Sequence, residues 1–272
     1  MVRGVLYYYS GSGNTRLACQ YLAKKIQSVE FDLVDILAEK ALDAGLYDVI
    51  GLAAFTDFLG PPYRFKTFVA GLPDVAGKAA FVFNTYGLMS GKTLPGMKKL
   101  AEARGLRVVN GHSLHTPENY PPNVAHGPAM DQAPDPNEMA LFEDFIAELD
   151  EQLPKAVADP SMSGFKIRLS LLETLIPKIP RTYARRDMGA KFVDAALCIG
   201  CGSCAKGCPY GAIKMANVVA PQTALPIFDE KLCYGCWRCF NRCPKKAIYT
   251  RKFRGEGHYP APNEFLRQKL RE

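Results

Sequence analysis

The sequence predicts an α/β protein: a doubly wound, five-stranded parallel sheet followed by a small α+β domain. Three observations support this fold class. Short apolar runs alternate with amphipathic segments over the first 150 residues, and eight of the nine cysteines lie between Cys198 and Cys243. The net charge also changes, from −5 over residues 1–160 to +12 over residues 161–272. Such unevenness is typical of two modules with different surfaces, and 48% hydrophobic residues exclude a mostly disordered chain.

Hydrophobic periodicity predicts the elements of the first module. Strands are expected at residues 2–9, 30–36, 47–55, 78–84 and 106–114, and helices at 15–27, 64–70, 91–104 and 137–153. The run 47–55 is apolar throughout, as a strand buried on both faces should be. Strands that alternate with helices form a parallel sheet, whose ligands bind at the carboxyl ends of the strands.

The first strand is followed at once by a loop rich in glycine and hydroxyl groups, Ser10-Gly11-Ser12-Gly13-Asn14-Thr15. Glycines let backbone N–H groups converge, and the start of the next helix adds a partial positive charge. The hydroxyls of Ser10, Ser12 and Thr15 can donate further hydrogen bonds. Arg16 stands where a dinucleotide-binding loop needs its third glycine, and the Gly-Lys-Ser/Thr of a triphosphate loop is absent. The loop therefore predicts a cradle for a phosphate monoester.

A Ser/Thr-x-Ser/Thr-Gly-Asn-Thr loop in this position resembles that of the flavodoxins, and the resemblance covers about residues 1–155. It implies bound FMN, with the phosphate in loop 10–15 and the isoalloxazine between loops 56–63 and 84–91. Tyr86 is the first candidate to stack on the ring and Tyr63 the second, with Phe58 also in competition and ordinary packing as the alternative. The residues of these two loops expected at the flavin are Pro62, Tyr63, Asn84, Thr85, Tyr86, Gly87 and Gly91.

The sequence departs from a short flavodoxin at residues 115–136, a segment with six prolines. A loop of this length inside a domain is usually functional or disordered. Its first part, residues 116–120, is expected to cover the flavin or to form its rim. His112, His115 and His126 lie in or near this loop and are expected to be solvent-exposed, with no assigned role.

The strongest signal in the chain is a repeat at an offset of 35 residues, in which residues 194–213 align with residues 229–248. Each copy contains Cys-x2-Cys-x2-Cys-x3-Cys-Pro, the run that binds [4Fe–4S] clusters in two-cluster bacterial ferredoxins. In that pattern the last cysteine of each run ligates the other cluster. One cluster is therefore expected on Cys198, Cys201, Cys204 and Cys243, and the other on Cys233, Cys236, Cys239 and Cys208.

Alternatives to iron–sulfur clusters explain the cysteines less well. Zinc sites usually use two separated Cys-x2-Cys pairs, and disulfides need an oxidising compartment for which no targeting signal is seen. Residues of about 190–250 resemble a two-[4Fe–4S] ferredoxin domain, with Ile199, Ile213 and Ile248 as its expected core. Trp237 takes the place of Gly202 and is expected to restrict water at the second cluster, so that the two potentials differ. Basic residues near the clusters compensate their negative charge, which disfavours nucleic-acid binding.

Together the two modules resemble the flavodoxin–ferredoxin fusion proteins of anaerobic bacteria and archaea. The expected domains are 1–155 for FMN, 156–190 as a connector, 191–250 for the clusters and 251–272 as a basic tail. In the connector, residues 165–176 are expected to pack between the domains, with an interfacial membrane helix as the less favoured alternative. The sequence predicts a cytoplasmic electron-transfer flavoprotein that relays low-potential electrons to a redox protein partner. The alternatives are an FMN-dependent oxidoreductase acting on a small substrate such as a quinone, and an electron-delivery subunit of a larger complex.

Overall fold

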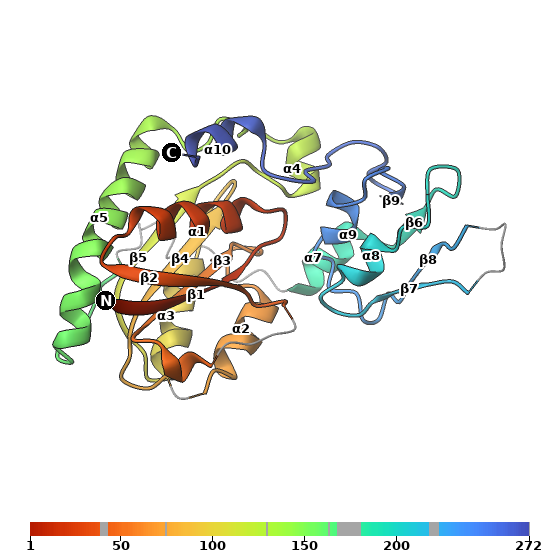
Figure 1. The fold of residues 1–272 in the computed structure, drawn as a ribbon. Coiled ribbons are helices and arrows are strands. Elements are labelled where there is room, and N and C mark those ends of the chain that lie inside the picture. The colour runs from red at the N-terminus through yellow and green to blue at the C-terminus, as the bar shows by residue number, and fades with distance from the viewer. Residues whose placement is uncertain are drawn as a thin grey trace. The chain divides into compact units, whose positions relative to one another are not determined.

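The computed structural model describes residues 1–38, 43–73, 75–128, 130–162, 164–167, 181–217 and 223–271 (Figure 1). The chain divides into two compact units. The first comprises Met1–Pro117, Met130–Lys178 and Asn263–Glu272, and the second comprises Glu118–Ala129 and Ile179–Pro262. Each unit is thus built from segments that are separated in the sequence.

The first unit contains a five-stranded parallel sheet in the order β2-β1-β3-β4-β5. This is the strand order of the flavodoxin-like doubly wound fold. The switch point, at which successive strands begin to be added on the other side of β1, lies between β1 and β3. The predicted fold class of this unit is confirmed. The strands are β1 (Val2–Tyr9), β2 (Val29–Asp35), β3 (Val49–Phe55), β4 (Ala79–Tyr86) and β5 (Arg107–His115), each within two residues of its predicted bounds.

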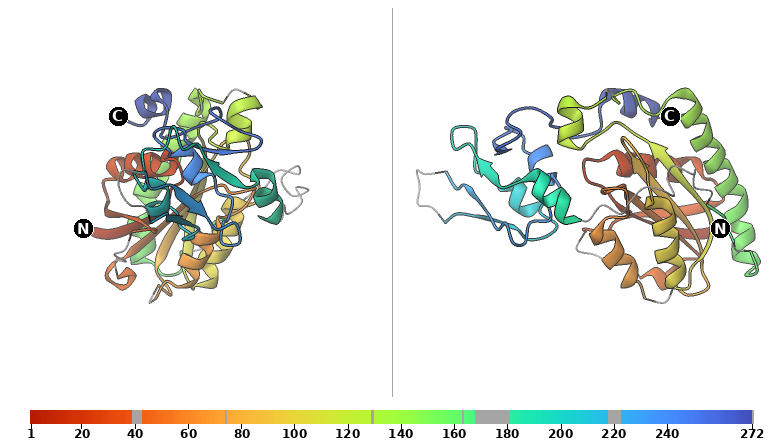
Figure 2. Two further views of the ribbon diagram at one scale, coloured as in Figure 1. Left: turned by 90° about the vertical axis from the view of Figure 1, so that its right-hand side faces the viewer. Right: turned by 180° about the vertical axis from the view of Figure 1, so that it is seen from behind.

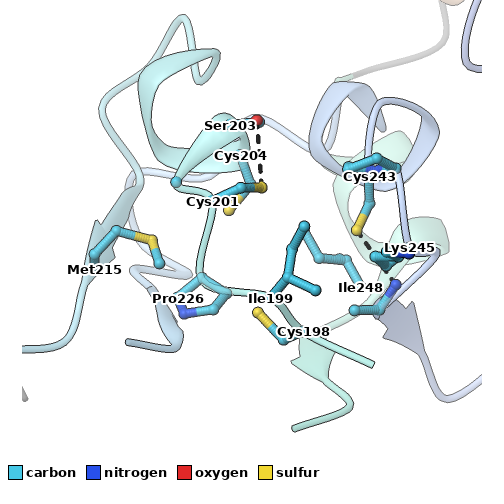
Figure 3. Close-up of a pocket in the computed structure, with 13 residues that line it drawn as sticks. Cys198, Ile199, Cys201, Ser203, Cys204, Met215, Pro226, Cys243, Lys245 and Ile248 are labelled. Carbon is cyan, nitrogen blue, oxygen red and sulfur yellow. Dashed lines mark hydrogen bonds between the residues drawn. The ribbon is translucent and has the colours of Figure 1, made fainter. Parts of the chain in front are cut away.

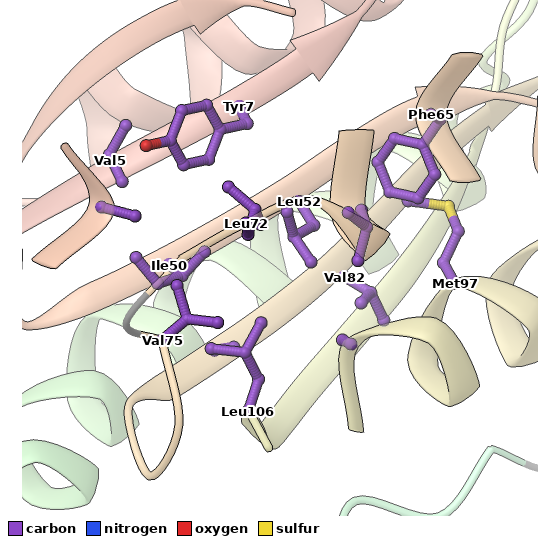
Figure 4. Close-up of a cluster of buried hydrophobic side chains, with 14 of the residues drawn as sticks. Val5, Tyr7, Ile50, Leu52, Phe65, Leu72, Val75, Val82, Met97 and Leu106 are labelled. Atoms are coloured by element: carbon purple, nitrogen blue, oxygen red, sulfur yellow. The ribbon is translucent and has the colours of Figure 1, made fainter. Parts of the chain in front are cut away.

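Helices cover both faces of this sheet (Figures 1 and 2). The helices α1 (Asn14–Lys25) and α5 (Pro136–Ala158) pack on one face, and α2 (Tyr63–Ala70) and α3 (Thr93–Ala103) pack on the other. Alternate residues of each strand point to opposite faces of the sheet. In β1, Leu6 faces α1 and α5, whereas Val5 and Tyr7 face α2 and α3 (Figure 4). The sheet is buried on both sides, which explains the continuous apolar run of β3.

The end of the chain returns to the first unit. Residues Glu264–Lys269 form helix α10, which is capped by the side chain of Asn263 and buries Leu266 and Leu270 in the core formed by α1 and α5. These residues belong to the expected basic tail 251–272, but Leu266 and Leu270 are buried in the core of the first unit. The tail hypothesis followed from the net charge, whereas two leucines spaced four residues apart supply the buried face.

The histidines near the end of β5 also differ from expectation. His112 lies within β5 and packs against the rings of Phe83, Phe142 and Phe145, with centroid separations of 6.5, 5.8 and 5.1 Å. His115 is the last residue of the strand, and its Nδ1 lies 2.8 Å from Oε1 of Glu138. Only His126, which is largely exposed, behaves as an ordinary surface histidine.

We expect His112 to make this unit less stable in mild acid. Burial lowers the pKa of His112 to about 4, from 6.5. Because the unfolded chain binds the proton more readily, stability falls as the pH drops from about 6.5 towards 4, by up to about 1.4 kcal/mol per pH unit. His112→Phe should remove this dependence, so the melting temperature measured by circular dichroism should fall less between pH 7 and pH 5 than in the wild type. His126→Phe is the control; equal falls in wild type and His112→Phe would contradict the assignment.

The second unit consists of two small antiparallel sheets and short helices. Strand β6 (Lys191–Val193) pairs with β9 (Ile248–Thr250), and β7 (Ile213–Met215) pairs with β8 (Pro226–Phe228). Helices α8 (Ser203–Lys206) and α9 (Arg238–Asn241) follow the cysteine runs, and α7 (Arg181–Met188) precedes β6. The offset of 35 residues relates β6 to β8, β7 to β9 and α8 to α9, so the sequence repeat is a structural repeat.

Part of the proline-rich segment belongs to this second unit. Residues Pro121–His126 form helix α4, and Tyr120 packs edge-on against Trp237 with ring centroids 6.1 Å apart. The backbone carbonyl of Asn119 accepts a hydrogen bond from Asn241, and Ala125 contacts the core formed by Met188, Trp237, Phe240 and Phe253. The expected continuous domain 1–155 is therefore interrupted. Residues 118–128 complete the cysteine-rich unit, and a role of residues 116–120 in covering the flavin or forming its rim stays a prediction.

The connector lies mostly outside the described residues. Of the predicted segment 165–176, Phe165 and Ile167 are described, and both pack against the core on the α2 and α3 face of the first unit. Residues 168–176 fall outside the described ranges, so the expected packing of that part of the segment stays a prediction. Across the part of the chain that is described, no helix combines the length and the apolar character needed to span a bilayer.

Candidate cofactor sites

The first of two cysteine-lined cavities in the second unit, here called site I, is shown in Figure 3. Its empty space is about 380 Å³, part of which is open to solvent. Cys198, Cys201 and Cys204 of the first repeat line it together with Cys243 of the second. The other walls come from Ile199, Met215, Pro226, Lys245 and Ile248.

The second cavity, site II, is of similar size at about 370 Å³. Cys233, Cys236 and Cys239 of the second repeat line it together with Cys208 of the first. The structure thus brings together the two sets of four cysteines predicted from the interleaved pattern. No group of three or more His, Cys, Asp or Glu side chains within the described ranges is arranged to hold a single metal ion. The sulfurs instead surround a cavity, as a cube of four irons requires.

Left-handed backbone turns place the cysteines around the cavities. Helix α8 starts after Gly202 at φ 70°, and helix α9 starts after Trp237 at φ 58°. Glycine adopts this conformation without steric cost, whereas tryptophan does not. The compensation is packing: Trp237 is almost fully buried and makes edge-on contacts with Phe240 and Phe253. Trp237 also lines site II, where the sequence analysis expected it to restrict water.

The cysteine electrostatics favour a positively charged group at both sites. Burial, with Cys236, Cys233 and Cys208 nearby, raises the pKa of Cys239 far above its usual range. Burial likewise raises the pKa of Cys204, with smaller contributions from Cys243 and Cys198. Thiolates gathered around one cavity repel one another, so a cationic iron core is needed to hold them together. These donor sets fit [4Fe–4S] clusters.

Several N–H groups donate hydrogen bonds to the cysteine sulfurs. The amide of Ala247 donates to Cys243 at 3.2 Å, and the amide of Ala212 donates to the equivalent Cys208 at 3.3 Å. At site II, Lys191 also donates to Cys233, from Nζ to Sγ at 3.0 Å. Burial by itself lowers the pKa of Lys191, but hydrogen bonds to Glu230 and Cys233 outweigh burial and raise it. Sequence reasoning missed Lys191, because it lies outside the cysteine runs.

Ile199 is placed differently from its prediction. Ile213 and Ile248 are buried, as expected of core residues, but Ile199 is 57% exposed. Cys201 is exposed as well, and its sulfur lies 3.4 Å from the hydroxyl of Ser203. In contrast, Lys191 and Trp237 at site II are almost fully buried. The two sites therefore differ in their access to water.

In the first unit, loop 10–15 has the geometry of a phosphate cradle. Gly13 has φ 118° and directly precedes α1, whose first turn contains no acidic residue. Ser10, Ser12, Asn14 and Thr15 are all buried. The backbone N–H of Arg16 donates a hydrogen bond to Ser10 Oγ at 3.3 Å. The side-chain amide of Asn14 donates to the backbone carbonyl of Pro117 at 3.0 Å. A buried set of hydroxyls at a helix N-terminus, with Arg16 next in sequence, fits a phosphate group.

Two residues predicted at the flavin have well-defined protein partners. The amide of Asn84 donates to the hydroxyls of Thr56 and Ser90 at 3.1 Å each, and its carbonyl oxygen accepts from Ser113 at 2.6 Å. Asn84 thus ties the ends of β3, β4 and β5 together, which identifies it as a positioning residue. The hydroxyls of Thr85 and Thr15 form a hydrogen bond of 2.8 Å, which links β4 to the cradle. Ser90 and Ser113 were not predicted, because only their pairing with Asn84 singles them out.

The two loops beyond β3 and β4 touch each other. Asp57 and Gly60 pair across a tight turn in which Phe58 and Leu59 have φ 47° and 65°. A Cβ on Gly91 would lie 2.7 Å from Cβ of Leu59, so only glycine fits there. Left-handed conformations in two non-glycine residues store backbone strain, which is common where a loop grips a ligand. Gly91, predicted at the flavin, is required by this loop contact.

The aromatic candidates differ in their surroundings. Tyr86, the last residue of β4, stacks on His115 with ring centroids 5.1 Å apart and an angle of 6° between the rings. Tyr63 begins α2 after Pro62 and is 55% exposed. Gly87 follows Tyr86 in a bend. The backbone N–H of Thr116 donates to the carbonyl of Tyr86 at 2.8 Å, so the start of the proline-rich segment borders this loop. Stacking of Tyr86 or Tyr63 on a flavin stays a prediction.

Comparison with known families bears directly on the cysteine-lined sites. Residues 197–247 match the family described as "4Fe-4S dicluster domain", a range that contains all eight cysteines of sites I and II. The chain joins a unit with the flavodoxin-like strand order to a region that is similar to dicluster 4Fe–4S domains. The first unit carries the phosphate-cradle loop and the second carries the cysteines.

Solved structures similar to this chain include several flavodoxins. A flavodoxin from the domain Archaea is 15% identical, with 56% of this chain and 99% of that chain covered and a TM-score of 0.43. Flavodoxin 1 from Bacillus cereus is 22% identical, with 56% and 97% covered and a TM-score of 0.43. The two-electron-reduced flavodoxin of Megasphaera elsdenii is 22% identical, with 54% and 99% covered and a TM-score of 0.39. No curated protein matches the chain.

Proposed function

We propose that the protein is an electron carrier that binds FMN in its first unit and two [4Fe–4S] clusters in its second, and exchanges electrons with a redox protein partner. The observation that carries the proposal is the pair of cavities, each lined by four cysteines drawn from both repeats. FMN exchanges one or two electrons, whereas each cluster carries one, so the chain joins two-electron and one-electron carriers. The protein contributes binding and tuning, and the cofactors supply the redox chemistry.

In the first unit, the cradle of Ser10, Ser12, Gly13 and Thr15 would hold the FMN phosphate. The strained turn at Phe58 and Leu59 and the loop that starts at Tyr86 would border the ring. Asn84 and Thr85 act behind these loops, because their side chains fix the loops to β5 and to the cradle. This assignment rests on the buried hydroxyls, the left-handed turn residues and the flavodoxin-like strand order.

The surface around site I suits a protein partner with acidic side chains. Leu197, Ile199 and Ile227 expose 48%, 57% and 59% of their area. Exposed lysines accompany these apolar side chains, namely Lys206, Lys214 and Lys245. Exposed apolar side chains accompanied by lysines favour association with a complementary acidic surface, and the positive charge speeds encounter. Electrons would therefore leave or enter the cysteine-rich unit through site I.

Cofactor analysis tests the proposal. Anaerobically purified protein should contain about eight irons and eight sulfides per chain. It should also contain FMN at an equimolar ratio to the polypeptide chain. Full iron with no flavin, even after FMN is added, would reject the flavin part of the proposal. Iron well below this level, in protein reconstituted with iron and sulfide, would reject the clusters.

Kinetics separate a carrier from an enzyme. A carrier should pass electrons to a one-electron protein acceptor with an acidic surface, with a rate that falls steeply as salt is raised, because basic residues steer the encounter. Substituting Lys206 and Lys214 by glutamine should lower that rate several-fold. Saturable turnover of a quinone far above the rate of free FMN would instead favour the small-substrate oxidoreductase.

A further inference from the structure

Sites I and II are not equivalent, and the 35-residue repeat shows where they differ. The repeat relates Lys191 at site II to Pro226 at site I, and both residues line their respective cavities. It likewise relates Glu230, the partner of Lys191, to Ala195. Site II is therefore faced by a charged pair at the positions where site I has a proline and an alanine.

Lys191 is held firmly against a cluster ligand. Its side chain is 1% exposed, and its Nζ donates to the carbonyl of Gly189 at 3.3 Å, to Oε2 of Glu230 at 2.6 Å and to Sγ of Cys233 at 3.0 Å. These three acceptors match the three N–H groups of an ammonium ion. The backbone N–H of Lys191 also donates to Glu230, at 3.1 Å. The position of the charge is thus fixed by the fold.

The charge of Glu230 does not cancel that of Lys191 at the sulfur. Glu230 is 41% exposed, so water screens its carboxylate, whereas the ammonium is buried and is the group that contacts Cys233. Reduction adds one negative charge to a cluster. Hydrogen bonds to sulfur and nearby positive charge both stabilise that added electron and raise the reduction potential.

We propose that Lys191 is a tuning residue that makes the cluster of site II the more readily reduced of the two. The inference rests on the proposed function, because it requires a cluster at each site. A single electron entering the unit from a low-potential donor would then reside at the drier site II, while site I exchanges electrons with the partner. The residues that act on site II are Lys191 directly and Glu230 through Lys191.

Opposite substitutions test the proposal in the full-length holoprotein. Lys191→Met removes the ammonium and should lower one of the two cluster potentials, with at least a tenfold change in the ratio of reduced to oxidised cluster at fixed potential, or about 59 mV for one electron. Glu230→Gln keeps the ammonium but removes its counter-charge, and should raise the same potential. Redox titration followed by electron paramagnetic resonance measures both. Lys231→Met is the matched control, because Lys231 is an exposed lysine of the same unit that is not among the residues lining site I or site II.

Iron content distinguishes the possible failures. If the wild type lacks two clusters, the proposed function fails before tuning is tested. If the Lys191→Met protein retains about eight irons and neither potential falls, or both fall equally, the tuning role is rejected. If Lys191→Met loses iron, Lys191→Arg and Glu230→Gln carry the test: Lys191→Arg should stay near the wild-type potential, and an unchanged or lowered potential in Glu230→Gln would overturn the proposal.

Discussion

Replacing Cys243 by alanine is expected to remove about four of about eight irons, and the cluster lost should be the one on Cys198, Cys201 and Cys204. Cys243 belongs to the second cysteine run, yet its side chain lines site I with the three cysteines of the first run. Without a fourth thiolate, the cluster loses a ligand and gains access to water from an already open site. Replacing Cys208 should in turn remove the cluster of site II.

Iron and sulfide analysis, with electron paramagnetic resonance of the dithionite-reduced protein, measures this result. A reduced protein with two clusters shows magnetic coupling between them, and loss of one cluster should leave a simpler, uncoupled signal. Cys19→Ala is the matched control: Cys19 is fully buried in the core of the first unit, away from both sites. If Cys243→Ala retained all its iron, the interleaved ligand assignment would be wrong.

The second large effect is expected at the phosphate cradle. Gly13→Ala should weaken FMN binding by about 5-fold to 150-fold, because φ 118° is outside the region that an L-residue adopts comfortably. Strain of this kind costs about 1–3 kcal/mol, and relieving it would turn the backbone N–H groups away from the phosphate. The expected loss is thus one of geometry, since no side-chain contact is removed.

Gly11→Ala is the matched control within the same loop. A Cβ on Gly11 would meet the ring of Phe55 at 3.7 Å, which is an ordinary contact, and Gly11 has no positive φ. Equilibrium dialysis of flavin-free protein against FMN compares the two variants, and iron analysis checks that the second unit is intact. If both variants bound FMN equally well, the left-handed turn at Gly13 would not be the basis of the cradle.

The sequence predicted most where its signals were local. The strands and helices of the first unit follow from hydrophobic periodicity, which depends on neighbouring residues. The two four-cysteine sets follow from spacing, because Cys-x2-Cys-x2-Cys brings three sulfurs to one side of a turn. The resemblance to two-cluster ferredoxins predicted the fourth ligand from the other run. These features needed no knowledge of distant contacts.

The features that escaped prediction depend on contacts between distant segments. Helices α4 and α10 are six residues long, and each is stabilised by packing on a surface formed elsewhere in the chain. The burial of His112 depends on phenylalanines of α5, and the exposure of Ile199 depends on which side of site I is open. Lys191 looked like one basic residue among many, until the strand pairing placed it beside Cys233.

The interleaved segments impose an order on biosynthesis. The core between α1 and α5 includes Leu266 and Leu270, so the flavodoxin-like unit is complete only after residue 270 has been synthesised. Residues 118–128 are synthesised long before the cysteine runs, although they belong to the same unit. The flavodoxin-like unit therefore completes its core only after every segment of the cysteine-rich unit has been synthesised. A gene truncated after residue 250 would encode a chain whose first unit lacks part of that core.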